Sequence, residues 1–429
     1  MFSGGSNATR LGPRFHQVWA AITISSLGDG MRFVALPLLA AQLTGDPRQI
    51  AAVSLAEQVP WLLLGLLSGA LADRFDRRRI LWTVDTARTV VVGLLALAVA
   101  TGAVSIPLLA AAGFLLGCGQ TLYNGGWSGM VPALVEPAAR TRANARLQAG
   151  SLITDTLLGT PLGAVLFGIA AVLPFLVDSA SFAAAATLVF LLRGDFRPRA
   201  QATPTSLAGL RRDTGEGVRW LWRHRLLRRL CLVAGAASLV DGGLIAVLVL
   251  YARHTLGLTS MGFALMVAAF AVGGIAGATA TPRLTARYGP PRVLTLATLG
   301  TGIAAAAAGA ATSGIAAGLF IAGYGAANLA WTVTAVSLRQ SLVPAELLGR
   351  VTMAYQMITG GAAALGTVAA GLSAHEFGLR SPFFAGAVVL AAAGLVSTRD
   401  AEPAARPVAA SLPAPGPAPE RTPAPQTHE

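Results

Sequence analysis

The sequence predicts an all-α membrane protein with twelve transmembrane helices in two six-helix, pseudo-symmetric bundles. Three observations lead to this fold class: a composition too apolar for a soluble chain, twelve apolar stretches of spanning length, and an internal repeat between the two halves. Apolar residues make up 54% of the 429 residues and charged residues only 12%, against about 25% charged in an ordinary soluble protein. A single soluble core is therefore excluded.

Twelve apolar segments are long enough to cross the ~30 Å hydrocarbon core of a bilayer as helices. The first follows Arg10 and Arg14 and is too long for the apolar core of a cleaved signal sequence, so we interpret it as a permanent helix. The predicted spans are 15–43, 49–71, 80–101, 105–133, 144–168, 170–192, 228–252, 260–284, 292–313, 315–341, 351–374 and 380–398.

Arginine is distributed unequally between the two sides of the predicted membrane. With a cytoplasmic N-terminus, the outer loops hold only Arg48, Arg253 and Arg380, and the other arginines outside the spans lie on the inner side. The positive-inside rule therefore predicts that both termini are cytoplasmic. The predicted organisation is a cytoplasmic N-terminal tail (1–14), a six-helix bundle (15–192), a basic cytoplasmic linker (193–227), a second six-helix bundle (228–398) and a disordered Pro/Ala-rich cytoplasmic tail (399–429).

Several function classes are excluded by residues that the chain lacks. All 32 basic residues are Arg, so there is no lysine for a phosphate-binding loop or a Schiff base. The two cysteines, Cys118 and Cys231, fall inside spans, and the five histidines are scattered, so no metal cluster is indicated. We expect no cofactor, no metal site and no enzymatic activity.

The linker places aromatic residues beside arginines at 219–225. This pattern is compatible with nucleic-acid binding, but an amphipathic helix on an anionic inner leaflet, with Trp220 and Trp222 at the interface, is favoured. We therefore expect a lipid bilayer and no nucleic acid as partner.

An internal repeat supports two related halves. The sequence Asn124-Gly125-Gly126-Trp127 late in span 4 is echoed 204 positions later by Asn328-Leu329-Ala330-Trp331 in span 10. Leu134-Val135 followed by Arg142 is echoed 208 positions later by Leu342-Val343 followed by Arg350. Parallel halves related by an axis along the membrane normal are one of the known repeat arrangements of transporters.

Residues 69–81 form a charged turn between predicted spans 2 and 3, with the pattern Gly-x-Leu-Ala-Asp-Arg-x-x-Arg-Arg-x-x-Leu. This pattern resembles the signature loop of the major facilitator superfamily. Asp73, the acid of this pattern, can meet a helix N-terminus or pair with a nearby arginine in one access state and not in the other. Such contacts would make the loop a latch. A simple topology-setting role remains the alternative for the basic residues. The predicted gating residues are Gly69, Asp73, Arg74, Arg77 and Arg78.

Further segments sharpen the resemblance to bacterial macrolide-efflux and enterobactin-exporter-like permeases. They are Ser26-Leu27-Gly28-Asp29-Gly30, Leu43-Thr44-Gly45-Asp46-Pro47, Arg142-Ala143-Asn144-Ala145 and the run from Pro174 to Phe182.

The resemblance implies a monomeric secondary transporter of the bacterial inner membrane. It would export small amphipathic molecules, such as a drug, natural product or siderophore, as a proton antiporter. Two departures are Asp76, where the signature loop usually has glycine, and a span 4 without the arginine of many antiporters. An uptake permease of the same fold is the main alternative, and a receptor or membrane-embedded enzyme is disfavoured.

Ionisable residues inside spans are candidate functional residues. Asp29 and Arg32 lie three positions apart and so on one helix face; either they pair, or Arg32 has another partner and Asp29 titrates. Asp29 and Glu57 are the candidate proton-coupling residues. Asp85 and Arg88 form a predicted structural pair near the signature loop, and Arg32 is assigned to the same charge-pair support.

Bulky amphipathic substrates need aromatic area and a few hydrogen-bonding groups among apolar walls. Matching positions in the two halves provide both, although tryptophan also anchors helices at the membrane interface. The predicted cavity residues are Asn124, Trp127, Asp178, Asn328 and Trp331.

Overall fold

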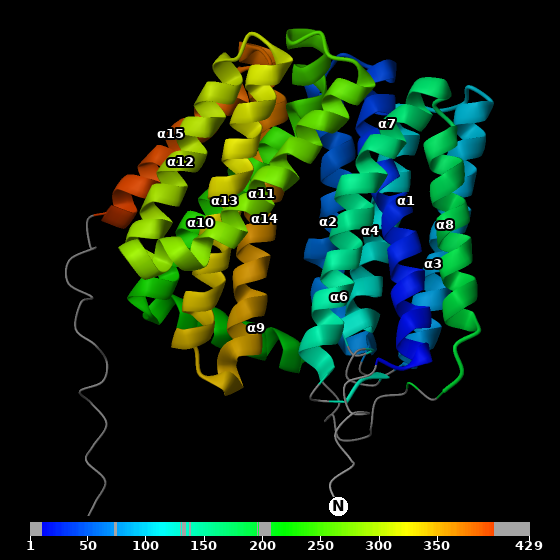
Figure 1. The fold of residues 1–429 in the computed structure, drawn as a ribbon, viewed down its shortest axis with the longest axis horizontal. Coiled ribbons are helices and arrows are strands. Elements are labelled where there is room, and N and C mark those ends of the chain that lie inside the picture. Colours follow the sequence, from blue (N-terminus) through cyan, green and yellow to red (C-terminus); the bar gives the residue numbers. More distant parts are fainter. Residues whose placement is uncertain are drawn as a thin grey trace, which may run out of the picture.

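The computed structural model describes residues 11–72, 75–128, 130, 134–136, 139–194, 196 and 207–398. Within these residues ten helices are long and apolar enough to cross a membrane. α2 (Pro47–Ala72) and α15 (Ser381–Thr398) occupy the other two predicted spans. The predicted fold class, an all-helical membrane protein of two pseudo-symmetric bundles, is confirmed (Figure 1).

The first half contains six helical crossings in the part of the chain that the structure describes. They are α1 (Pro13–Leu43), α2, α3 (Arg77–Ala100), α4 (Ile106–Ser128), a fifth crossing made of α6 (Arg140–Leu152), the π-helical segment η2 (Ile153–Gly159) and α7 (Thr160–Ile169), and α8 (Leu173–Phe190).

The second half repeats this arrangement after α9 (Leu207–Arg223). Its crossings are α10 (Arg225–Leu250) with the π-helical turn η3 (Tyr251–Thr255), α11 (Ser260–Tyr288), α12 (Pro290–Ala310), α13 (Gly314–Leu342), α14 (Ala345–Phe377) and α15. Several of these helices are longer than the predicted spans, because a helix can continue into water beyond the ~20 residues that the hydrocarbon requires.

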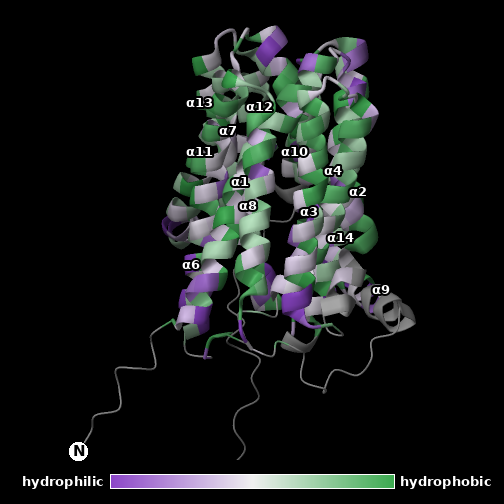
Figure 2. Ribbon diagram, turned by 90° about the vertical axis from the view of Figure 1, so that its right-hand side faces the viewer, coloured by the Kyte–Doolittle hydropathy of each residue, from purple (hydrophilic) through white to green (hydrophobic). Residues whose placement is uncertain are grey.

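Hydrophobic residues occupy much of the helix lengths, and hydrophilic residues gather at the lower end of α6 (Figure 2). Large aliphatic side chains are exposed on the outer surface of the bundle, for example Ile303 of α12 at 70% and Val388 of α15 at 69%. In water such a surface would be unfavourable, whereas lipid chains solvate it.

Small residues allow the helices within each half to approach closely. On α11, a Cβ added to Gly273 would lie 1.9 Å from the Ala322 carbonyl oxygen of α13, and one added to Gly277 would lie 2.0 Å from that of Ala326. A larger side chain at either position would push the two helices apart. The close packing of α11 on α13 therefore depends on these glycines.

The two ends of the molecule differ in how the halves meet. We call the end with the α1–α2 loop the Asp46 end, and the opposite end, where α1 begins and α9 lies, the Arg-rich end. At the Asp46 end one continuous apolar cluster includes Leu38 and Phe167 of the first half and Leu250 and Phe263 of the second. At the Arg-rich end each half has a separate apolar cluster. The described residues of the two halves thus share a core at the Asp46 end only.

Contacts between α2 and α14 carry part of the junction toward the Asp46 end. The Gln58 side chain donates to the Thr367 hydroxyl at 3.1 Å, and the Thr367 hydroxyl donates to the Gly242 carbonyl of α10 at 3.1 Å. In the loop before α2, the Asp46 carboxylate lies 3.6 Å from the His375 ring of α14. A second junction is made by α7 packing against α11.

The predicted amphipathic segment of the linker forms α9, which lies across the Arg-rich end (Figure 1) and packs on α14 and α10. Leu221 of α9 is fully buried, and Glu216 pairs with Arg350 of α14 at 2.7 Å. Trp220 stacks on His224, whereas Trp222 is exposed. α9 is therefore packed against the second half by one face. The predicted disordered tail (399–429) lies outside the described residues.

Candidate transport site

The centre of the first half is built around α1, where two glycines let neighbouring backbones approach. A Cβ on Gly28 would lie 2.4 Å from a carboxylate oxygen of Asp178 on α8, and one on Gly30 would lie 2.0 Å from the Asp155 carbonyl of η2. Only glycine fits at these positions without moving α8 or η2. These glycines thus allow the α1 charges to lie beside acids of two other helices.

Arg32 is the hub of this arrangement. Its guanidinium lies 2.8 Å from the Asp29 carboxylate, 2.8 Å from that of Glu57 on α2 and 3.2 Å from that of Asp178. The sequence left open whether Arg32 pairs with Asp29 or with another residue. In the structure Arg32 pairs with Asp29 and also has other partners. One guanidinium faces three carboxylates, so the group as a whole can accept a proton without losing all its ion pairs. We call these four residues the Arg32 cluster.

The three acids of the Arg32 cluster differ in exposure. The side chain of Glu57 is 37% exposed, that of Asp29 is 23% exposed, and that of Asp178 is fully buried. Asp178 therefore lies behind Arg32 and lines neither of the pockets described below, although the sequence suggested it as a cavity residue. Its place on α8 next to Gly28 accounts for this burial.

Asp85 and Arg88 of α3 lie at the periphery of this cluster, with a guanidinium–carboxylate separation of 3.9 Å. Arg88 donates to the Gln120 side chain of α4 at 2.5 Å and lies over the rings of Tyr123 and Phe182. The described contacts of this pair thus connect α3 with α4 and α8, and none of them reaches Arg78 of the signature loop.

The signature loop is described only in part. Asp73 and Arg74 lie outside the described residues, and Gly69 lies in the last turns of α2. The Arg78 guanidinium donates to the carbonyls of Val189, at 3.3 Å, and Phe190 at the C-terminal end of α8. A cation at a helix C-terminus interacts favourably with the helix dipole.

Asp76 explains how the loop ends without the usual glycine. Its side chain accepts a hydrogen bond from the backbone N–H of Arg78 at 3.0 Å and caps the N-terminus of α3. Aspartate is among the preferred N-cap residues. Arg77 is the first residue of that helix.

A pocket of about 470 Å³ opens beside the Arg32 cluster, between α1, α2, α4 and the fifth crossing. Asp29, Arg32 and Glu57 line it, together with Arg88 and Asp155. The predicted cavity residues Asn124 and Trp127 of α4 also line it. We call this the N-half pocket. Its wall is strongly charged.

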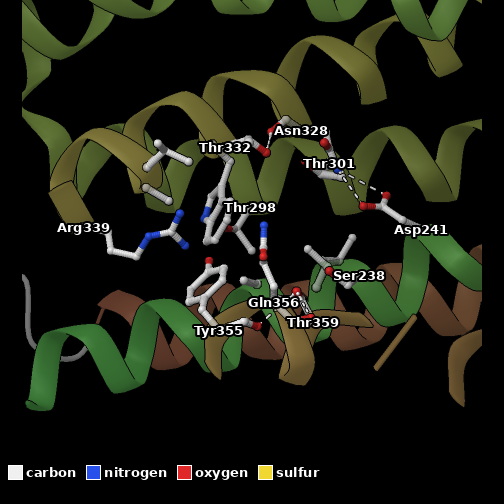
Figure 3. A pocket seen from close by; sticks show the side chains of 16 residues that line it. Ser238, Asp241, Thr298, Thr301, Asn328, Thr332, Arg339, Tyr355, Gln356 and Thr359 are labelled. Carbon is white, nitrogen blue, oxygen red and sulfur yellow. Dashed lines mark hydrogen bonds between the residues drawn. The ribbon is translucent and has the colours of Figure 1, made fainter. Parts of the chain in front are cut away.

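A second pocket, of about 240 Å³, lies in the second half, and we call it the C-half pocket (Figure 3). The predicted residues Asn328 and Trp331 line it. Asp241 of α10 accepts hydrogen bonds from the Tyr324 hydroxyl and from the Asn328 amide, the latter at 3.2 and 3.1 Å. Elsewhere in the pocket, the Arg339 guanidinium lies 4.4 Å from the Tyr355 ring centre.

The two pockets use equivalent positions of the repeat. Ser26-Leu27-Gly28-Asp29-Gly30 on α1 corresponds to Ser238-Leu239-Val240-Asp241-Gly242 on α10. This second copy was the signal in the sequence that would have marked Asp241 as a site residue. Equivalent residues that line both pockets are Ser26 and Ser238, Asp29 and Asp241, Asn124 and Asn328, Trp127 and Trp331, Gln148 and Gln356, and Ser151 and Thr359.

Within the described residues, no group of three or more His, Cys, Asp or Glu side chains is arranged to hold a metal ion. The polar groups of the pockets are instead ion pairs, amides and hydroxyls around a bundle of spanning helices. This combination defines a multi-pass membrane transporter with two pseudo-symmetric halves.

The family follows from comparison with known proteins. The chain belongs to the transmembrane secretion effector family, which it matches over residues 10–420, and its relatives are transporters of the major facilitator superfamily. It is 27% identical to the multidrug efflux pump Tap of Mycolicibacterium fortuitum, over 91% of this chain and 96% of Tap. It is 26% identical to the enterobactin exporter EntS of Shigella boydii, over 86% of this chain and 89% of EntS.

Among solved structures, the nucleoside transporter NupG superposes with a TM-score of 0.70 at 14% identity, over 90% of this chain and 99% of NupG. At that identity the likeness concerns the fold alone. The protein is thus a multi-pass major facilitator transporter with bacterial relatives, which implies the bacterial inner membrane and a small-molecule substrate.

Proposed function

We propose that the protein exports small amphipathic molecules across the bacterial inner membrane by alternating access, in exchange for protons. The observation that carries this proposal is the Arg32 cluster in the wall of the N-half pocket, because the carboxylates of Asp29 and Glu57 lie beside a cavity there. The similarity to the multidrug efflux pump Tap and the enterobactin exporter EntS supports export of a drug, natural product or siderophore.

Alternating access needs two halves that separate at one end while they meet at the other. The shared apolar core at the Asp46 end and the separate cores at the Arg-rich end support this motion. We propose that the halves, 15–192 and 228–398, rock as units joined by the linker 193–227. A single chain supplies both halves and both pockets, so we propose that the monomer transports.

The orientation follows from the arginines. Arg48, Arg253 and Arg380 lie at the Asp46 end, whereas α6, α9 and the start of α10 place many arginines at the other. By the positive-inside rule we propose that the Arg-rich end and both termini are cytoplasmic. The described conformation then has its shared core on the outer side.

Proton coupling is assigned to Asp29 and Glu57, which line the N-half pocket, whereas Asp178 is buried behind Arg32. A proton on either acid weakens its ion pair with Arg32 and so changes the balance of charges that holds α1 to α2. Inward movement of one proton yields about 2.3 kcal/mol per 100 mV of membrane potential.

The signature loop is proposed to act as a latch on the cytoplasmic side. The contact of Arg78 with the end of α8 anchors the start of α3. Asp73 and Arg74 are proposed to make the contacts that differ between access states, with Gly69 and Arg77 flanking them.

The test is accumulation of fluorescent amphipathic compounds in cells that express the wild type, Asp29→Asn or Glu57→Gln, each with and without a protonophore. We expect lower accumulation with the wild type, and restoration by the protonophore and by at least one substitution. Asp46→Asn, an acid outside the pockets, is the matched control and should behave as the wild type. Higher accumulation with the wild type would contradict export and favour an uptake permease.

A further inference from the structure

Asp241 differs from its equivalent Asp29 in having no cationic partner among the described residues. Both of its described side-chain partners, Tyr324 and Asn328, are neutral donors. In the described part of the chain no arginine or histidine lies within 4.0 Å of its carboxylate, whereas Asp29 has Arg32 at 2.8 Å. The position equivalent to Arg32 in the second half is Leu244. The Asp241 carboxylate is thus positioned by hydrogen bonds, and its negative charge is left for another partner.

The surroundings of Asp241 favour an organic partner over a hydrated inorganic ion. The C-half pocket is walled by the aromatic rings of Trp331 and Tyr355 and by small apolar residues such as Ala234 and Ala237. Aromatic faces attract a cation whose charge is spread over apolar substituents. A metal site would need several acidic or histidine ligands, and none of the described residues besides Asp241 supplies one in this pocket.

Arg339 limits the total positive charge that a ligand bound in the C-half pocket can carry. It is eleven positions after Asn328 on α13, which corresponds to about 16 Å along the helix, and its guanidinium covers the Tyr355 ring. Figure 3 shows Asp241 and Arg339 on opposite sides of the pocket, with Gln356 and Thr298 between them. A second positive charge on the ligand would be repelled by Arg339.

We propose that the C-half pocket binds lipophilic organic monocations, with Asp241 as the counter-ion of the positive centre and Trp331 and Tyr355 against the apolar body. The inference rests on the proposed function, because it names the substrate class for one pocket of the same transporter. It assigns the two halves different tasks: the N-half pocket exchanges protons and the C-half pocket recognises the charge of the substrate.

The test measures equilibrium binding of radiolabelled benzyltrimethylammonium to the purified full-length protein in detergent. Competitors are its neutral carbon isostere, neopentylbenzene, and the dication 1,4-bis(trimethylammoniomethyl)benzene. The variants are Asp241→Asn, which removes the charge at nearly constant shape, Asp241→Glu, which keeps it, and Trp331→Leu. Glu57→Gln, in the N-half pocket, is measured beside them. Size-exclusion profiles and thermal unfolding show whether each variant is folded.

We expect the monocation to bind more tightly than either competitor. Asp241→Asn should weaken its binding by about tenfold or more and remove the preference over neopentylbenzene, while Asp241→Glu retains that preference. Trp331→Leu should weaken binding of the monocation by several fold, because the aromatic face against its apolar body is lost.

An unchanged preference in folded Asp241→Asn, or no binding of the monocation up to its solubility limit, would overturn the inference. Loss of the preference in Glu57→Gln but not in Asp241→Asn would move the cation site to the N-half pocket and equally overturn it. These failures are separate from failure of the proposed function, which is measured as efflux from cells and can persist without charge selectivity at Asp241.

Discussion

The two pockets occupy equivalent places in the repeat but contain different chemistry. On α1, Asp29 is followed three residues later by Arg32, whereas on α10 Asp241 is followed by Leu244. Among its described lining residues, the N-half pocket has five charged side chains on α1, α2, α3 and η2: Asp29, Arg32, Glu57, Arg88 and Asp155. The C-half pocket has hydroxyls, amides and aromatic rings with only Asp241 and Arg339 charged among its described lining residues.

The same contrast extends to α3 and its counterpart α12. When the starts of these helices are aligned, Asp85 and Arg88 correspond to Thr298 and Thr301, and both threonines line the C-half pocket. Their hydroxyls donate to their own helix, Thr301 to the Ala297 carbonyl at 2.8 Å. A repeated scaffold can therefore hold the helices alike while the side chains give the two pockets different charges and hydrogen-bonding groups.

Arg32→Gln is the substitution with the largest expected effect on this comparison. The substitution leaves three carboxylates without their guanidinium, and removing one partner of a buried ion-pair group costs about 3–5 kcal/mol. We expect a lower free energy of unfolding and loss of efflux, measured by thermal unfolding in detergent and by accumulation in cells. The control is Leu244→Met at the equivalent position, which should cost less than about 1.5 kcal/mol. Equal effects at the two positions would refute the asymmetry between halves.

The glycines after the two aspartates test whether the scaffold itself is alike. A Cβ on Gly30 would lie 2.0 Å from the Asp155 carbonyl, and one on Gly242 would lie 2.3 Å from the Ala363 carbonyl. Gly30→Ala and Gly242→Ala should each destabilise by about 1–3 kcal/mol through overpacking, measured by thermal unfolding. Gly361→Ala, where no atom lies within 4 Å of the added Cβ, should be tolerated. A cost at only one of the first two positions would show that the halves are not packed equivalently.

Transfer of the N-half charge into the second half sharpens the comparison further. Leu244→Arg places a guanidinium three residues after Asp241, on the same helix face, as Arg32 follows Asp29. It should lower the affinity for benzyltrimethylammonium by about tenfold although Asp241 is intact, measured by the same binding experiment. Leu244→Met should leave that affinity unchanged. Tighter monocation binding in Leu244→Arg would contradict the role given to Asp241.

The smallest effect is expected at the Asp46 end, where Asp46 pairs with Arg48 of its own half at 2.9 Å and lies 3.6 Å from the His375 ring of the second half. A hydrogen bond from Arg48 lowers the pKa of Asp46 below its ordinary value of about 4. At pH values above the ordinary pKa, the ionised Asp46 carboxylate therefore contributes its full stability. This contribution is lost as the pH falls through the lower pKa of the folded state. Asp46→Asn should change thermal unfolding at pH 7 only slightly, because exposed ion pairs contribute little. A large loss would show that the contacts of Asp46, and not the shared apolar core, close the Asp46 end.

Much of the site was readable from the sequence, but its connections were not. Charged residues in apolar spans identified Asp29, Arg32 and Glu57, because an ionisable group in hydrocarbon needs a partner or a cavity. The spacing between α1, α2 and α8 in the chain says nothing about which acids reach Arg32. Asp178 was therefore suggested as a cavity residue, whereas it is buried behind the guanidinium. Asp76 was recognised as a departure from the signature loop, but its capping hydrogen bond required the backbone geometry.

By itself, the sequence determined the class of fold, the twelve crossings and the repeat. Hydropathy and helix length are local properties, because the hydropathy and length of each segment decide whether it can cross the bilayer. It also identified polar positions in spans that face a cavity or a partner. Only the tertiary structure decided that Arg32 meets three acids, that Asp241 meets none of the described arginines, and that the halves share a core at one end. These contacts result from the packing of helices that are far apart in the sequence. Replacing Gly28 or Gly30 by a larger residue would move α8 or η2 and so change which side chains meet.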